Sequence, residues 1–183
     1  MQSKNSILLL GPAHPYRGGI AETQNEYAAT LKKSGYEVIV WTFKFQYPSI
    51  IFPGKTQISN DSKFEELNVE RKIHSINPFN WISLANNINQ IKPKYLFLRY
   101  WTPFISPCWY NISKRISKKI KIIGLVDNWI PHEPKYFDRF LNTLFEKSCD
   151  CFITLSSSVS NQIKQSSPKD VLSTFHPINK MLP

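Results

Sequence analysis

Two short stretches of the sequence combine residue types that bind phosphates and sugar hydroxyls. The first runs from His14 through Pro15, Tyr16 and Arg17 to Gly18-Gly19, directly before a predicted helix. A backbone without Cβ atoms lets a phosphate come close, and a helix N-terminus offers N–H groups and positive potential. A tight glycine turn remains the alternative interpretation.

The glycine pair also excludes two common nucleotide motifs. No Gly-Lys-Ser/Thr follows it, so it is not a P-loop, and it does not fit Gly-x-Gly-x-x-Gly. A nicotinamide-dependent oxidoreductase is therefore disfavoured.

The second stretch is DNWIPHE, from Asp127 to Glu133. It combines a carboxylate, an amide and the neighbouring pair His132-Glu133, which can bind sugar hydroxyls or act as acid and base. A solvated loop histidine is the alternative for His132. No His-Glu-x-x-His occurs and no other ligands have zinc spacing, so we expect no metal site.

Alternating apolar segments must position these residues. Strands are predicted over residues 7–10, 36–41, 68–73, 95–98, 121–126, 151–155 and 171–175. Helices are predicted over residues 20–34, 77–91, 103–116, 137–145 and 158–165. This order predicts an α/β fold, a Rossmann-like, doubly wound parallel sheet. Both polar stretches follow predicted strands, at the carboxyl ends where such sheets bind ligands.

Charge and composition limit the classes of binding partner that can be expected. The 183 residues carry a formal charge of +10, which predicts attraction to anions. Residues 112–121 read as a basic amphipathic helix, either a solvated face or a patch for an anionic membrane surface. No nucleic-acid-binding module is recognisable, so nucleic acid is not expected. Three cysteines without framework spacing and no long apolar run indicate a cytoplasmic protein, at most peripheral at the inner face of the membrane.

These stretches together resemble family 4 glycosyltransferases, which have the GT-B architecture. The match rests on Gly18-Gly19-Ile20, the helix ending at Gly35, the strand YEVIVW, the DNWIPHE stretch, FITLSSSV, and His176-Pro177-Ile178. The resemblance covers essentially the whole chain. It implies an N-terminal, acceptor-side domain over residues 1–177, with residues 178–183 beginning a linker to an absent C-terminal donor domain.

The resemblance also implies an activity. Similar enzymes move a sugar from a nucleotide-sugar donor to a glycan or lipid-linked acceptor, with retention of configuration and without metal or cofactor. Cell-envelope polysaccharide synthesis is their commonest context. The half-enzyme alone is expected to be inactive. The alternative is a non-catalytic module that binds a glycan or anion, or docks a partner chain. The presence or absence of a donor domain beyond Pro183 discriminates the two.

The implied roles fall on named residues. Gly18 and Gly19 would touch the donor diphosphate, and Asp127, where many relatives have histidine, would face the anomeric centre as the catalytic-site residue. The acceptor side would comprise His14, Tyr16, Arg17, Asn128, Trp129, His132 and Glu133. Tyr16, Trp101 and Trp129 are expected to expose aromatic surface on the cleft wall and to make the isolated domain self-associate weakly.

Overall fold

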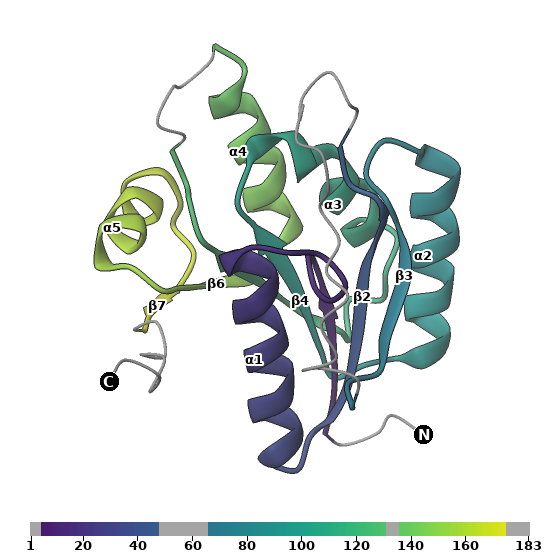
Figure 1. The fold of residues 1–183 in the computed structure, drawn as a ribbon. Helices are drawn as coiled ribbons and strands as arrows, with labels where there is room; N and C mark the ends of the chain where they lie inside the picture. Colours follow the sequence, from purple (N-terminus) through teal and green to yellow (C-terminus); the bar gives the residue numbers. More distant parts are fainter. Residues whose placement is uncertain (1–4, 48–65, 131–135, 175–183) are drawn as a thin grey trace, which may run out of the picture.

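The computed structural model describes residues 5–47, 66–130 and 136–174. Within them, seven strands form one parallel sheet in the order β3-β2-β1-β4-β5-β6-β7 (Figure 1). The strands are β1 Ser6–Leu10, β2 Glu37–Phe45, β3 Val69–His74, β4 Tyr95–Tyr100, β5 Lys121–Val126, β6 Cys151–Thr154 and β7 Val171–Ser173. The predicted α/β fold with a Rossmann-like parallel sheet is confirmed, with each strand close to its predicted place.

Helices cover both faces of the sheet. They are α1 Gly19–Lys33, α2 Pro78–Ile91, the 3₁₀ turn η1 Pro103–Ile105, α3 Ser106–Ser113, α4 Asp138–Ser148 and α5 Ser157–Ser166. Side chains at alternate strand positions form two cores: Leu9 packs in a cluster with Ala28 of α1, and Leu8 in another with Trp109 of α3. In Figure 1, α1 accordingly stands in front of the sheet and α3 and α4 behind it.

The central strands are mostly apolar because both faces of the sheet are covered. All five residues of β1 are buried, as expected of a parallel strand between two helical layers. None of the described helices is long and apolar enough to cross a membrane.

Short sequence signals set the helix ends. Asn77 caps α2, since its Oδ1 accepts hydrogen bonds from the N–H groups of Phe79 and Asn80 at 3.0 and 3.3 Å. After α1, Gly35 adopts φ 86°, a left-handed conformation that glycine takes without a Cβ penalty. The chain can then reverse directly into β2.

The predicted basic helix over residues 112–121 is wrong. The α3 helix ends at Ser113, β5 begins at Lys121, and the residues between form turns. Ile116 and Ile120 are nevertheless buried. Asn89 of α2 holds the turn by donating to the Arg115 carbonyl at 2.9 Å and accepting from the Ser117 N–H at 2.8 Å. This tertiary capture outweighs a helical isoleucine period of only two and a half turns.

Candidate functional site

The N-terminus of α1 is open at the carboxyl edge of the sheet. Gly18 precedes the helix with φ 109° and ψ 159°, and Gly19 is its first residue, with no side chain capping the end. A Cβ atom added at either glycine would meet nothing within 4 Å. Glu22 donates its N–H to the Gly18 carbonyl at 3.0 Å, which begins the helix. The first turn therefore presents backbone to an accessible surface, as a phosphate-binding helix end must.

A small cavity lies against this helix end. Its volume is about 260 Å³, and it joins the ends of three strands. Its lining is Pro12, Tyr16, Arg17, Gly18, Gly19, Ile20, Ala21, Gln46, Tyr47 and Trp101. Within this lining, Trp101 Nε1 donates a hydrogen bond to the Tyr47 hydroxyl. Burial raises the pKa of the Tyr47 phenol, so this aromatic part of the lining is neutral at ordinary pH.

A buried ion pair joins the ends of β4 and β5. Arg99 donates from Nε to Asp127 Oδ2 at 2.6 Å and from Nη2 to Oδ1 at 2.5 Å. The Arg99 side chain is 1% exposed and that of Asp127 is 11% exposed. This bidentate geometry fixes the carboxylate in one orientation. Asp127, predicted from its motif, is thus held at the sheet edge by Arg99, which was not among the predicted site residues.

The signal for Arg99 was its place inside an apolar strand. It follows YLFL in β4, and a charge in a strand covered on both faces requires a partner. The sequence alone did not show that this partner would be Asp127, because the two residues are 28 positions apart.

Further polar groups of α1 gather around this pair. Arg99 Nη1, Gln24 Nε2 and Tyr27 Oη are buried and have no hydrogen-bond partner among the described residues. The Arg99 guanidinium lies 6.0 Å from the centre of the Tyr27 ring. Burial raises the pKa of the Tyr27 phenol, so it stays a neutral hydroxyl. Gly11 is required here because a Cβ atom would lie 2.5 Å from Arg99 Cβ.

The predicted acceptor-side residues have different surroundings. Arg17 and Asn128 are exposed, and the His14 N–H donates to Asn25 Oδ1 at 3.1 Å. Tyr16 lines the small cavity but is only 9% exposed, with the Arg71 guanidinium 5.8 Å from its ring centre. His132 and Glu133, like His176 and the predicted linker at 178–183, lie outside the described residues.

The expectation that Tyr16 and Trp129 expose aromatic surface is wrong. Trp129 is 3% exposed, its ring packs against Tyr100 and Phe152, and its Nε1 donates to Ser166 Oγ at 2.9 Å. An indole that finds both an apolar pocket and a hydroxyl acceptor has no reason to face water. Trp101 is partly exposed.

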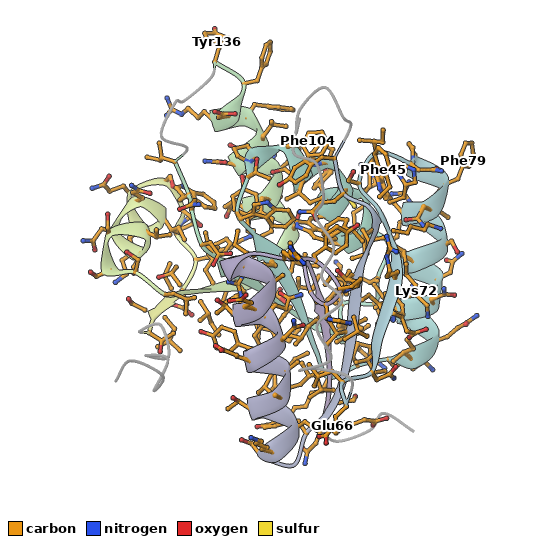
Figure 2. The ribbon with its side chains drawn as sticks, viewed as in Figure 1. Phe45, Glu66, Lys72, Phe79, Phe104 and Tyr136 are labelled. Carbon is orange, nitrogen blue, oxygen red and sulfur yellow. The ribbon has the colours of Figure 1, made fainter. Side chains whose placement is uncertain are left out.

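Three strongly exposed aromatic rings lie instead at the start of α4. They are Tyr136, Phe137 and Phe140, exposed by 96%, 69% and 61%, and a further ring, Phe79 in the first turn of α2, is exposed by 83%. Figure 2 shows Tyr136 projecting away from the rest of the domain.

A larger cavity of about 670 Å³ lies between α4 and α5, beside Trp129 and Ile130. Most of its polar lining already has structural partners. Asn142 accepts from the Tyr100 hydroxyl and donates to the Trp129 carbonyl, at 2.6 and 2.8 Å. Asn142 thereby ties the backbone at Trp129, two residues after Asp127, to the side chain at the end of β4. No group of three or more potential metal ligands of the types His, Cys, Asp and Glu occurs within the described ranges.

Solved structures share this fold. Lipopolysaccharide outer core galactosyltransferase WaaB superposes with a TM-score of 0.61 at 13% identity, over 91% of this chain and 44% of that one. An α-glucosyltransferase in complex with UDP gives 0.62 at 12% identity, over 95% and 44%. The fold is that of one domain of a GT-B glycosyltransferase. The chain spans less than half the length of these two neighbours.

A third neighbour has nearly the same extent. A sucrose-phosphate synthase structure from Thermosynechococcus elongatus gives a TM-score of 0.57 at 10% identity, over 97% of this chain and 91% of that one. The sequence matches no protein-family model and no curated protein sequence. At these identities the GT-B likeness concerns the fold alone.

Proposed function

We propose that this chain is the acceptor-side half of a family 4 glycosyltransferase. The enzyme would transfer a sugar from a nucleotide-sugar donor to a glycan or lipid-linked acceptor, with retention and without metal or cofactor. The observation that carries the proposal is the open Gly18-Gly19 helix end on a GT-B-type sheet. Structural neighbours solved with UDP and with UDP-glucose support the donor class.

On the donor side, the open helix end at Gly18 and Gly19 would hold the diphosphate. The first turn of α1 lines the small cavity, so its free N–H groups give the cavity a positive potential. The exposed Arg17, which also lines the cavity, adds to that potential. Such fixed dipoles and charges stabilise a leaving diphosphate without a bound cation. The remaining donor contacts would come from a C-terminal donor domain, reached through a linker that starts at residue 178, so the chain alone would be inactive.

As the catalytic-site residue, Asp127 would face the anomeric centre of the transferred sugar and accept a hydrogen bond from one of the hydroxyls near it. The bidentate Arg99 contact orients its carboxylate and leaves 11% of the side chain accessible. Many similar enzymes have histidine at this position, whereas this chain has the carboxylate of Asp127. Because a largely buried carboxylate needs a charged partner, Arg99 accompanies it.

The proposed acceptor residues fall into two groups with different roles. His14, Tyr16, Arg17, Asn128, His132 and Glu133 would shape the acceptor surface. Trp129 would contribute by anchoring its segment to Ser166, since its ring is buried.

We place the enzyme in the cytoplasm, peripheral at the inner face of the cell membrane, in cell-envelope polysaccharide synthesis. The basic charge supports contact with an anionic surface. Burial raises the pKa of the Cys108 and Cys149 thiols, which favours their staying protonated and reduced.

The first experiment measures the intact mass of the native product and then its release of nucleoside diphosphate from a panel of nucleotide sugars. A product of about twice this length that turns over one donor is expected. In that product, Gly19→Ala should lower the rate at least about tenfold by crowding the diphosphate, while adding no backbone strain.

Gly35→Ala is the control, because Gly35 lies at the other end of α1 and also has open space around it. Its positive φ makes alanine strain the backbone there and not at Gly19, so a loss of stability alone would lower the rate of the control first. Equal rates for the Gly19 and Gly35 variants would remove the diphosphate role. A native product that ends at Pro183 and turns over no donor, alone or with a separately encoded subunit, would favour the non-catalytic binding module.

A further inference from the structure

The opposite, amino edge of the sheet carries two basic cavities on the two sides of one turn. Residues 114–120 form this turn, which we call the basic turn. A cavity of about 570 Å³ lies between it and the end of α2, with Lys92, Arg115 and Lys119 in its lining. A cavity of about 300 Å³ lies on its other side, toward α4, with Lys114, Lys118 and Lys147 in its lining.

These cations exceed the negative charge around them. Asp150 is the one carboxylate that lines the smaller cavity, and no carboxylate lines the larger one, among the residues that the structure describes. The C-terminal ends of α2, α3 and α4 supply about half a negative charge each. Complementing three helix ends and one aspartate would occupy fewer than half of the six cations. The excess predicts an anionic ligand.

The basic turn is held rigidly enough to present these charges. Asn89 brackets it with the two hydrogen bonds to Arg115 and Ser117. Arg115 Nη1 donates to the Asn111 carbonyl and to Asn111 Oδ1, at 2.7 and 3.2 Å, which ties its guanidinium to the end of α3. Ile116, 8% exposed, anchors the turn by packing into the hydrophobic core. A preformed arrangement lowers the entropic cost of binding.

We propose that the larger cavity binds a phosphate group, carried either by an anionic lipid headgroup or by a free phosphate ion. A guanidinium with two ammonium groups and no competing carboxylate suits phosphate, which accepts several charge-assisted hydrogen bonds. The second cavity widens the basic surface, so that a phosphate-bearing surface would contact both sides of the turn.

This site is separate from the proposed donor site. Lys121 begins β5 and Asp127 directly follows its end, so six strand residues, about 20 Å, separate the two edges. One small ligand cannot reach both. The inference therefore does not rest on the proposed glycosyltransferase function, and its failure would leave that function standing.

The test uses the 183-residue chain and a charge-matched pair of variants. The site variant combines Lys92→Gln, Arg115→Gln and Lys119→Gln. The control combines Lys33→Gln, Lys44→Gln and Lys164→Gln, which are exposed lysines on α1, β2 and α5. Both variants lose three positive charges. Circular dichroism confirms that each one folds.

Two probes distinguish the sources of phosphate. The first is sedimentation with vesicles of phosphatidylcholine plus phosphatidylglycerol, against phosphatidylcholine alone. The second is amide chemical shifts of residues 89–92 and 114–120 during titration with inorganic phosphate. Binding to the anionic vesicles without phosphate-induced shifts identifies a lipid headgroup. Saturable shifts at low phosphate concentration identify a free phosphate site.

The site variant should lose about a hundredfold in affinity for whichever probe binds, since each basic residue near an anionic surface contributes roughly a factor of five. The control should lose less than about fivefold. An equal loss of affinity in both variants would show a general effect of net charge and would overturn the proposed phosphate site. Absence of binding to either probe would overturn it as well.

Discussion

The two edges of the sheet treat charge in opposite ways. At the carboxyl edge, Arg99 and Asp127 are buried against each other, and their charges orient side chains within the fold. At the amino edge, six basic side chains, four of them in the basic turn itself, line the two cavities, and among the described residues one carboxylate lines them as well. A buried charge must be paired because desolvation is costly, whereas a hydrated charge can remain unpaired and available to a ligand. The net charge of +10 therefore says little about the candidate substrate site.

The largest effect is expected at the buried pair. Asp127→Ala leaves the Arg99 guanidinium buried and uncompensated, and should lower the free energy of unfolding by about 3–5 kcal/mol. Urea unfolding of the purified chain measures this. The double variant Arg99→Met with Asp127→Leu removes both charges and should be far closer to the wild type. A loss below about 1 kcal/mol for Asp127→Ala would mean that the pair behaves like a surface ion pair.

Within α1, Gly18→Ala and Gly35→Ala should cost similar stability and differ in function. Both glycines have positive φ, 109° and 86°, so alanine strains the backbone by about 1–2 kcal/mol at each position. Thermal unfolding should show comparable losses. Only Gly18→Ala should also reduce turnover of a nucleotide sugar by the native product. Equal turnover in the two variants would mean that the carboxyl-edge helix end does not contact the donor.

Removing charge from the amino edge should leave the stability of the fold nearly unchanged. Lys92→Gln and Lys119→Gln neutralise exposed side chains, and each should change the free energy of unfolding by less than about 0.5 kcal/mol. Either change could even stabilise the chain by relieving repulsion between neighbouring cations. A loss above about 2 kcal/mol in the double variant would place these lysines in the structural framework, like Arg99, and erase the contrast between the edges.

The smallest effect concerns Glu70 on β3, a surface pair that resembles neither edge. The hydrogen bond from Lys72, at 2.7 Å, is the main cause that lowers the pKa of Glu70, and Trp41 Nε1 adds another. A carboxylate whose pKa is lowered by folding adds stability above its unfolded pKa and loses it as the pH falls through the folded value.

Glu70→Gln should therefore weaken the dependence of stability on pH below about pH 4.5 and slightly lower stability at neutral pH. The effect should be a fraction of a kcal/mol, because both partners are more than a third exposed. Urea midpoints between pH 3 and 7, compared with the wild type, measure it. Parallel curves for the two proteins would contradict the assigned role of Lys72.

Local sequence was sufficient wherever burial on two faces forces a strand to be apolar. The run ILLL of β1 and the segment KIIGLV of β5 could be recognised because each is short, apolar and followed by polar residues. The glycine end of α1 could be recognised for a similar reason, since two glycines before a helix leave its first N–H groups open.

The same local reasoning failed where long-range contacts decide. The isoleucines at 112, 116 and 120 have a helical spacing, yet Asn89, on a different helix, holds the chain there as a turn by donating one hydrogen bond and accepting another. Trp129 looked like a site residue because it stands in a polar motif, but Ser166 is 37 positions away and gives its indole a buried partner.

The sequence by itself determined the alternation of strands and helices, the edge at which polar loops gather, and the excess of basic charge. Those properties follow from the order of apolar and polar residues along the chain, because the side-chain periods of strands and helices translate that order directly into buried and exposed faces. Only the tertiary structure decided that Asp127 is oriented by Arg99 and that the basic residues surround a turn with a cavity on each side. Pairing and cavities depend on which segments meet in space, and parallel crossovers join positions far apart in the sequence.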